Sequence, residues 1–216
     1  SAQATQATVP TQGLVAGGNA PPVTDAVEEY DGTSWTEKNN LTTARRLLMG
    51  AGTTTAMIGF GGLPNIQKTE KWDGTSWTEV NDINTQRSGI GTCGLQTAAI
   101  AMGGYSGSAS ALTEIYDGTS WTESSGDLNS ARDNPGASGS TTAALCYSYG
   151  TEIWDGTSWA TGANLGTQRS YLQGMGSTSQ GSGKALAAGG YSPAGQVANV
   201  EEWTDPVYTI KTVTVS

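Results

Sequence analysis

A five-residue string, Asp-Gly-Thr-Ser-Trp, occurs four times in the chain. The copies stand at 31–35, 73–77, 117–121 and 155–159, so that successive copies are 42, 44 and 38 residues apart. A string repeated at such even spacing indicates that one supersecondary unit has been repeated in tandem. The chain is therefore constrained to a repeat architecture, and function is to be sought where the repeats differ from one another.

Each unit contains segments typical of four β-strands. A Gly-spaced segment of small residues follows an Arg, and an apolar run such as Ala98–Gly104 then ends at paired glycines, as expected for a strand buried on both faces. After a loop, Thr113–Tyr116 alternates in the manner of a half-buried strand. The Asp-Gly-Thr-Ser turn reverses the chain into a fourth strand, which begins at Trp121. Such units, about 43 residues long, are typical of β-propeller blades.

Five units fit into a single domain that spans residues 1–216. Their approximate bounds are 1–40, 41–82, 83–126, 127–164 and 165–216. Counting back from Gly17 with the spacing of the later units places Ser1 at the position of the Arg that opens a unit. In the last unit Trp203 takes the position of Tyr30, and Thr209–Ser216 alternates like a final edge strand. We predict an all-β fold, a β-propeller of five four-stranded blades.

The tryptophans are the largest candidates for the core. The chain has seven Trp and eight Tyr but only one Phe, and each buried aromatic side chain removes roughly 150–250 Å² from water. We expect the tryptophans to pack between neighbouring blades; a sugar-stacking role is the alternative. They are Trp35, Trp72, Trp77, Trp121, Trp154, Trp159 and Trp203.

The order of these motifs resembles that of kelch-like β-propellers. The matching features are the glycine pairs, an aromatic residue ten to thirteen residues later, a Trp five residues further on, and an Arg that opens the next unit; Asn84–Gly91 is the most similar stretch. Tandem Tyr/Trp-Asp-Gly-Thr-Ser-Trp-Thr units also resemble a kelch-like class found in tail fibres and other virion proteins of bacteriophages, marine phages especially. The chain departs from the kelch pattern at Ser148 and Tyr149, which replace a glycine pair, and in having five units where six or seven are usual.

The strand order predicts two different faces. If consecutive strands are antiparallel, the Asp-Gly-Thr-Ser turns lie on one face with the turns between first and second strands. The loops between second and third strands lie on the opposite face, which we call the variable face because these loops differ in sequence and length. They are 19–24, 63–68, 105–110, 149–151 and 191–196. Variable loops on a rigid scaffold are the usual carriers of binding.

One Arg opens each of the last four units, and one Glu stands two residues before each unit's aromatic. The resemblance implies a ligand role, since arginines at this position of kelch adaptors contact acidic peptides. The alternative is a structural bidentate pair, because the guanidinium fork matches a carboxylate. The residues are Arg45, Arg87, Arg132 and Arg169, with Glu28, Glu70, Glu114, Glu152 and Glu201.

Other residues of the variable face are further candidates for ligand contact. Tyr105 and Tyr191 each follow a glycine pair directly, a position that suits sugar or peptide binding as well as plain loop anchoring. Unit four departs most from the pattern, with Asp133 and Asn134 after its Arg and Tyr149 at the missing glycines. This asymmetry fits a binding site, sequence drift and contact with a neighbouring protein equally well.

Composition argues against several classes of function. The chain has no His, which removes the commonest general base and metal ligand at neutral pH. Neither a nucleophile motif nor a spaced Cys/His cluster or calcium loop is present, so we expect no catalysis, metal or cofactor. A carboxylate pair brought together across blades, as in propeller-fold glycosidases, stays open. The net charge of −9 disfavours a nucleic-acid partner, because phosphate binding needs a basic face.

Cysteine usage and the absence of targeting segments bear on the compartment. Cys93 and Cys146 fall at different positions of their units, so we expect buried free thiols, as in a chain folded in a reducing cytoplasm. The sequence contains no signal peptide, transmembrane segment or lipidation motif, and we expect no membrane insertion.

Two functions from different classes follow from the resemblance. The first is a virion module, in a tail fibre or as a decoration, that is assembled in the host cytoplasm and binds a host surface glycan or protein through its variable face. The second is a purely structural virion component that contacts other virion subunits. Either role is compatible with an oligomer within the particle. A kelch-type protein-interaction adaptor and a glycan-active enzyme are further alternatives.

Overall fold

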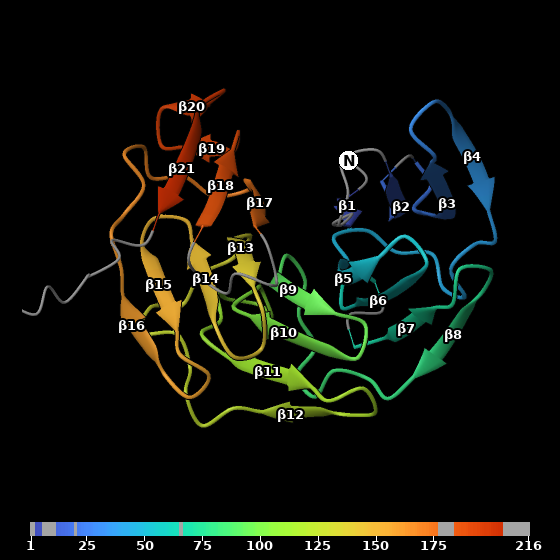
Figure 1. Ribbon diagram of the computed structural model, residues 1–216, viewed down its shortest axis with the longest axis horizontal. Helices are drawn as coiled ribbons and strands as arrows, with labels where there is room; N and C mark the ends of the chain where they lie inside the picture. The colour runs from blue at the N-terminus through green and yellow to red at the C-terminus, as the bar shows by residue number, and fades with distance from the viewer. Residues whose placement is uncertain (1–2, 6–11, 20, 65–66, 177–183, 205–216) are drawn as a thin grey trace, which may run out of the picture.

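The chain folds into an arc of antiparallel β-sheets (Figure 1). The computed structural model describes residues 3–5, 12–19, 21–64, 67–176 and 184–204. Consecutive strands pair in chain order within each sheet, and the described residues contain no helix. The predicted all-β fold of repeated antiparallel units is confirmed at this level.

Four of the sheets have four strands. The first contains β1 (Gln3–Thr5), β2 (Gly13–Gly18), β3 (Thr24–Tyr30) and β4 (Trp35–Lys38). The second contains β5 (Met49–Thr53), β6 (Ala56–Phe60), β7 (Thr69–Trp72) and β8 (Trp77–Val80). The third contains β9 (Gly91–Leu95), β10 (Ala98–Met102), β11 (Thr113–Tyr116) and β12 (Trp121–Glu123). The fourth contains β13 (Gly136–Gly139), β14 (Ala144–Tyr147), β15 (Thr151–Trp154) and β16 (Trp159–Thr161).

The fifth sheet has three described strands. They are β17 (Gln173–Gly176), β18 (Lys184–Ala188) and β21 (Val200–Thr204). A small hairpin of β19 (Tyr191–Ser192) and β20 (Gly195–Gln196) projects from the connection between β18 and β21. The predicted edge strand at Thr209–Ser216 lies outside the described residues.

The repeated string forms the same turn in all four units. The Asp Oδ1 accepts hydrogen bonds from the backbone N–H groups of the following Thr and Ser, as at Asp73, where the distances are 2.8 and 2.7 Å. The glycine of the turn has a left-handed φ, 92° at Gly74, which glycine adopts without strain. The short string thus contains both elements that the reversal requires.

The core lies between the sheets. Each of four apolar clusters combines residues of two successive sheets, and the first strands of successive sheets, β1, β5, β9, β13 and β17, lie side by side. From the second sheet on, the Trp after the turn packs on the preceding sheet: Trp77 contacts the cluster that contains Leu14 and Val27, and the centroids of the Trp121 and Phe60 rings lie 4.6 Å apart. Neighbouring units therefore bury one another's apolar faces.

Six of the seven tryptophans are buried or half-buried as predicted. Those buried are Trp72, Trp77, Trp121, Trp154 and Trp159, and Trp203 is half-buried. The prediction is wrong for Trp35, whose side chain is 53% exposed. Trp35 belongs to the first sheet, and among the described residues no preceding sheet lies against the face that it presents.

The first unit differs from the predicted frame. Gln3 pairs with Ala16 as Met49 pairs with Phe60, whereas counting back from Gly17 would place Thr5 at that position. The connection between the first two strands is thus two residues longer in unit one than in unit two. Ser1, which is predicted to take the position of the opening Arg, lies outside the described residues.

The arc is open between its two ends. The fifth and first sheets stand on either side of this opening (Figure 1), and among the described residues β17 does not pack on β1 in the way that the other first strands pack on one another. Within the described part of the chain, the two end sheets therefore each have one face that no neighbouring sheet covers.

Candidate functional site

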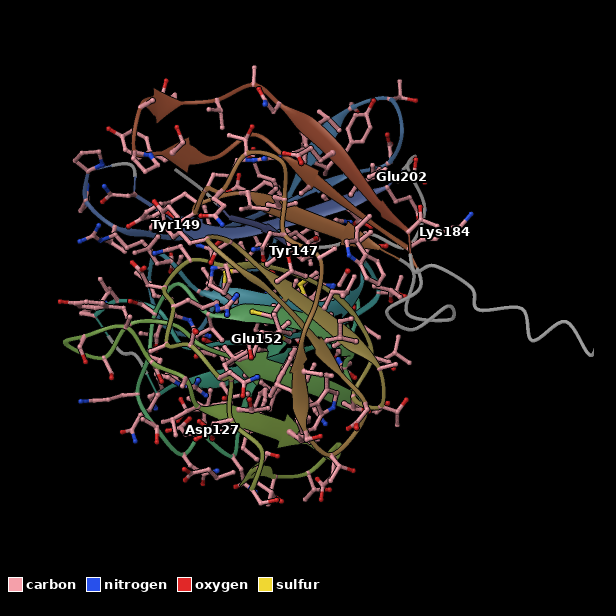
Figure 2. The ribbon with its side chains drawn as sticks, turned by 90° about the vertical axis from the view of Figure 1, so that its left-hand side faces the viewer. Asp127, Tyr147, Tyr149, Glu152, Lys184 and Glu202 are labelled. Carbon is pink, nitrogen blue, oxygen red and sulfur yellow. The ribbon has the colours of Figure 1, made fainter. Side chains whose placement is uncertain are left out.

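The two faces predicted from the strand order are present. Tyr149 lies on one side of the molecule, and Lys184 and Glu202 of the fifth sheet lie on the opposite side (Figure 2). On the latter side the Asp-Gly-Thr-Ser turns lie against the turns between first and second strands, so that a Cβ on Gly74 would be 3.4 Å from the Thr55 carbonyl oxygen. The side of Tyr149 is the variable face.

The arginines that open the units do not reach the surface. Each is buried and forms an ion pair with a Glu of its own unit, namely Arg45 with Glu70, Arg87 with Glu114, Arg132 with Glu152 and Arg169 with Glu201. Glu152, which is labelled in Figure 2, is buried. The fifth glutamate, Glu28, is exposed and has no arginine partner among the described residues. The structural role is therefore the one that the geometry shows, and ligand contact is blocked by burial.

The ion pairs tie the variable loops to the scaffold. Arg87 Nη2 donates to Glu114 Oε1 at 2.7 Å, while the other carboxylate oxygen accepts a hydrogen bond from the Asn84 backbone at 2.8 Å, so the pair is not bidentate as predicted. Arg87 Nη1 donates to the carbonyl oxygens of Gly103 and Leu112 at 2.6 and 2.8 Å. These two residues flank a variable loop, and one side chain therefore holds both of its ends.

The charge of these arginines is maintained despite their burial. Desolvation lowers the pKa of Arg87, and the adjacent Glu114 carboxylate opposes this shift. An Arg pKa starts so far above neutrality that the guanidinium remains protonated. The ion pair is thus a permanent part of the scaffold at physiological pH.

A backbone belt connects the units at the inner edge of the variable face. Leu47, Gly89, Asn134 and Tyr171, each two residues after the opening Arg, have left-handed φ angles of 47–56°. The N–H groups of the last three each donate to the carbonyl oxygen of the preceding member, at 3.3, 2.8 and 2.9 Å in chain order. We call these four residues the inner belt. The place of Asn134 in it is structural, since Asn tolerates this conformation better than most residues.

The exposed aromatic rings of the variable face are tyrosines. The exposed fraction is 48% for Tyr105, 45% for Tyr149, 57% for Tyr171 and 51% for Tyr191. We call these four residues the tyrosine set. Three of them were predicted from the sequence, and Tyr171 was not. The signal that could have identified it is its position two residues after an Arg, where the kelch-like stretch has Gly89.

The backbones that carry these rings are fixed. Tyr105 exchanges two hydrogen bonds with Ser88, at 2.8 and 3.0 Å, and Tyr191 exchanges two with Ser170 at the same distances. The predicted alternative of loop anchoring is thus provided by the backbone, while both residues are about half exposed. Both rings are available for contact on a rigid support.

Unit four contributes Tyr149 from a tight turn. The Ser148 N–H donates to Gly150 O at 2.9 Å, and Ser148 O accepts from the Arg169 N–H at 3.4 Å, so the turn lies beside the start of unit five. Tyr147, by contrast, is buried and its hydroxyl donates to Leu186 O at 3.1 Å. The shortened loop therefore presents one of its two tyrosines.

The acidic candidate of unit four, Asp133, and the amide candidate, Asn134, lie close to each other. Asn134 Nδ2 donates to Asp133 Oδ2 at 3.3 Å, and both side chains are half-buried. Asn134 O accepts the hydrogen bond from the Tyr171 N–H. Asp133 and Asn134 thus lie next to the tyrosine set at the junction of units four and five.

A hollow of about 620 Å³ lies at the end of the arc. Its lining consists of Tyr171, Gly190, Tyr191, Gln196 and Val197. None of these residues is charged. The hollow therefore combines two aromatic rings, a side-chain amide and backbone polar groups.

The described residues offer no metal centre and no membrane-crossing helix. No group of three or more Cys, Asp or Glu side chains within them is arranged to hold an ion, and none of their segments is a helix of the length and hydropathy needed to span a bilayer. Cys93 and Cys146 are buried and free, as predicted, and lie in the cluster between the third and fourth sheets.

No protein-family model matches the chain, and no curated protein matches it either. What the variable face can do chemically follows from its own residues. Rigid, half-exposed phenol rings beside uncharged polar groups suit non-covalent contact with sugars or with polypeptide surfaces.

Proposed function

We propose that the five sheets are the blades of a kelch-like β-propeller that acts as a non-enzymatic binding module. Its ligand is a glycan or protein of a host cell surface, and the tyrosine set makes the contact. The observation that carries this proposal is the presence of four half-exposed tyrosine rings on one face, on loops held by buried ion pairs and paired backbones.

Tyrosine suits this role on physical grounds. Its ring offers a large apolar surface with few rotatable bonds, and its hydroxyl both donates and accepts hydrogen bonds. Because the Tyr105 and Tyr191 backbones are already fixed by hydrogen bonds, little conformational entropy is lost on binding, and more of the contact energy appears as affinity.

The charge distribution favours a neutral ligand. The chain has 10 basic and 19 acidic residues, and Arg45, Arg87, Arg132 and Arg169 are buried in ion pairs. An anionic ligand would approach a negatively charged protein whose cations are largely engaged, which electrostatics disfavours. Neutral sugars and uncharged polypeptide surfaces meet no such penalty.

We further propose that the module is displayed on a phage virion, in a tail fibre or as a decoration. The resemblance of the tandem units to kelch-like virion proteins supports this part. The alternative is a structural component that contacts other virion subunits. Trp35, Leu186 and Val200 favour the alternative if the arc stays open, because they are then exposed apolar residues outside the tyrosine set.

Binding of the labelled protein to a broad microbial glycan array and to candidate host cells tests the proposal. The variant Tyr105→Ala/Tyr191→Ala should lose saturable binding while keeping its melting temperature, because both rings are half-exposed. The matched control is Leu95→Ala, which removes a 44% exposed side chain beside a turn of the opposite face and should bind as the parent does.

Two results would contradict the proposal. Undiminished binding by the double variant would assign the contact to another surface. A folded protein that binds nothing, even when multimerised to increase avidity, would favour the structural role within the particle.

A further inference from the structure

The uncovered face of the fifth sheet carries two exposed aliphatic residues. Leu186 stands three residues before Gly189 as Leu14 stands three residues before Gly17. Leu14 is fully buried, yet Leu186 is 40% exposed. The second residue, Val200, stands three residues before Trp203 and is 65% exposed.

The first sheet shows what such a pair of residues binds. Val27, three residues before Tyr30, is the counterpart of Val200, and it packs together with Leu14 against Trp77 of the next unit. The fifth sheet thus repeats the leucine and valine that receive a tryptophan between the first and second sheets. No tryptophan among the described residues covers them, which leaves both side chains exposed.

The uncovered face of the first sheet carries the complementary group. Trp35 follows its Asp-Gly-Thr-Ser turn as Trp77 follows the next one. Trp77 is 6% exposed on the first sheet, and Trp35 is 53% exposed. Among the described residues, the one aromatic ring that the Trp35 ring contacts belongs to its own unit, the Tyr30 ring, with the two centroids 5.3 Å apart.

Unpaired backbone groups at the hollow are an independent sign of a missing neighbour. On the third sheet, Gly104 N–H donates to Arg132 O at 2.8 Å, and the Arg132 N–H donates to Ser110 O at 2.9 Å. The corresponding groups of the fifth sheet, Gly190 N–H and Val197 O, have no partner among the described residues. The hollow lies over these groups, where the next unit is seated on the third sheet.

The space around one glycine of the fifth sheet also indicates that a neighbouring unit is missing. A Cβ on Gly17 or Gly103 would stand 2.4 or 2.7 Å from a carbonyl oxygen of the next unit. At Gly189, whose φ of 63° matches theirs, the nearest described atom is Val197 O at 3.8 Å. The fifth sheet therefore has the backbone shape that receives a neighbouring unit, without a unit in place.

We propose that the first sheet of the same chain docks on this face, with the Trp35 ring on Leu186 and Val200, and so closes the arc into a ring. The inference extends the five-blade propeller of the proposed function and does not depend on ligand binding. The occupant is the chain's own first sheet because the two end sheets flank one opening (Figure 1).

Closure is compatible with an exposed tyrosine set. Tyr105 is the counterpart of Tyr191, each following a glycine pair, and Tyr105 remains 48% exposed although the fourth sheet is seated on the third. Tyr191 is expected to keep a similar exposure when the first sheet is seated on the fifth. Failure of closure and failure of ligand binding are therefore separate outcomes.

Thermal unfolding of single and double variants of the full chain tests closure. Trp35→Ala should lower the melting temperature by roughly 6–20 °C, the range for a buried aromatic truncated in a chain of this size. Leu186→Asp should also lower the melting temperature. The decrease in the double variant should be smaller than the sum of the two single decreases, because both substitutions remove the same contact between Trp35 and Leu186. Trp121→Ala serves as the buried-interface reference, and Leu95→Asp as the exposed control without effect.

Concentration dependence and light scattering complete the experiment. A monomeric mass and a melting temperature independent of protein concentration are expected for closure within one chain. Near-parental melting of both Trp35→Ala and Leu186→Asp would overturn the proposal and establish the open arc in solution. A dimer that melts higher at higher protein concentration, and that Trp35→Ala dissociates, would overturn it in favour of a second copy.

Discussion

Trp159 donates a hydrogen bond from its indole Nε1 to the hydroxyl oxygen of Thr113 at 2.9 Å. Both side chains are buried, and the bond joins the fourth sheet to the third. The corresponding pair one interface earlier is Trp121 and Thr69, and neither Trp121 Nε1 nor Thr69 Oγ1 has a hydrogen-bond partner among the described residues. The same two positions of the repeat thus form this bond at one interface and leave both groups unpaired at the interface before it.

Thr113→Val is expected to destabilise the protein by about 1–3 kcal/mol, because the buried Trp159 N–H would be left without an acceptor. The matched control is Thr69→Val, which removes a hydroxyl that makes no hydrogen bond and should change stability by no more than about 0.5 kcal/mol. Urea unfolding of both variants measures the difference. Equal losses in the two variants would contradict the role of the bond.

Glu114→Gln should destabilise the protein by about 3–5 kcal/mol, since it leaves the buried Arg87 charge without its counter-ion. Denaturant unfolding monitored by tryptophan fluorescence gives the value. Lys68→Ala, which breaks the solvent-exposed ion pair with Glu79, is the control and should show no measurable change. A small effect of Glu114→Gln would mean that water or a neighbouring group compensates the arginine.

The two cysteines should be unreactive in the folded protein. Burial raises the pKa of Cys146 to about 12 and also raises that of Cys93, and the thiolate is the reactive form. We expect no labelling by a thiol reagent at pH 8 until denaturant is added, and two labelled thiols afterwards. Rapid labelling of the native chain at either site would contradict the packing between the third and fourth sheets.

The same shifts predict how stability depends on pH. A thiol whose folded pKa is raised contributes its full stabilising effect below the unfolded value near 8.5, and this effect is lost as pH rises toward the folded value. Stability should therefore fall between about pH 9 and pH 12. The decrease of stability with pH should be smaller in the variant Cys93→Ala/Cys146→Ala. An identical decrease would mean that groups other than the two thiols cause it.

The turn aspartates should titrate below the ordinary value. At Asp73 the N–H groups of Ser76 and Thr75 hold the pKa of the carboxyl below its ordinary value, because they stabilise the ionised form. Stability linked to this group is present above about pH 4 and is lost as pH falls through the lowered pKa. NMR titration of the four turn aspartates measures the shift. An ordinary pKa would mean that the turn is open in solution.

Much of the scaffold could be predicted because it depends on short-range sequence. The Asp-Gly-Thr-Ser string contains its own hydrogen-bond acceptor and its own left-handed glycine, so each turn forms without help from other units. The Arg and Glu of a unit also meet within that unit, as Arg87 and Glu114 do, and their repetition identified the structural pair as one of two interpretations.

The candidate site could be predicted only in part. Tyr105 and Tyr191 follow glycine pairs, and this position indicated loops of the variable face. Tyr171 does not follow a glycine pair. It is exposed at a position of the inner belt where the backbone is left-handed, and the tertiary structure sets this conformation. The arginines show the opposite case, because a charged residue in sequence gives no indication of whether a carboxylate will remove it from the surface.

The sequence by itself determined the repeat, the turns, the order of strands and the residue types at each position of a unit. Only the tertiary structure decided which copy of a position is buried. Trp35 and Trp77 follow the same string, and Leu14 and Leu186 occupy the same place before a glycine pair, yet one of each pair is buried and the other exposed. The physical reason is that these side chains are buried by the neighbouring unit, and a residue's own repeat does not encode whether a neighbour is present.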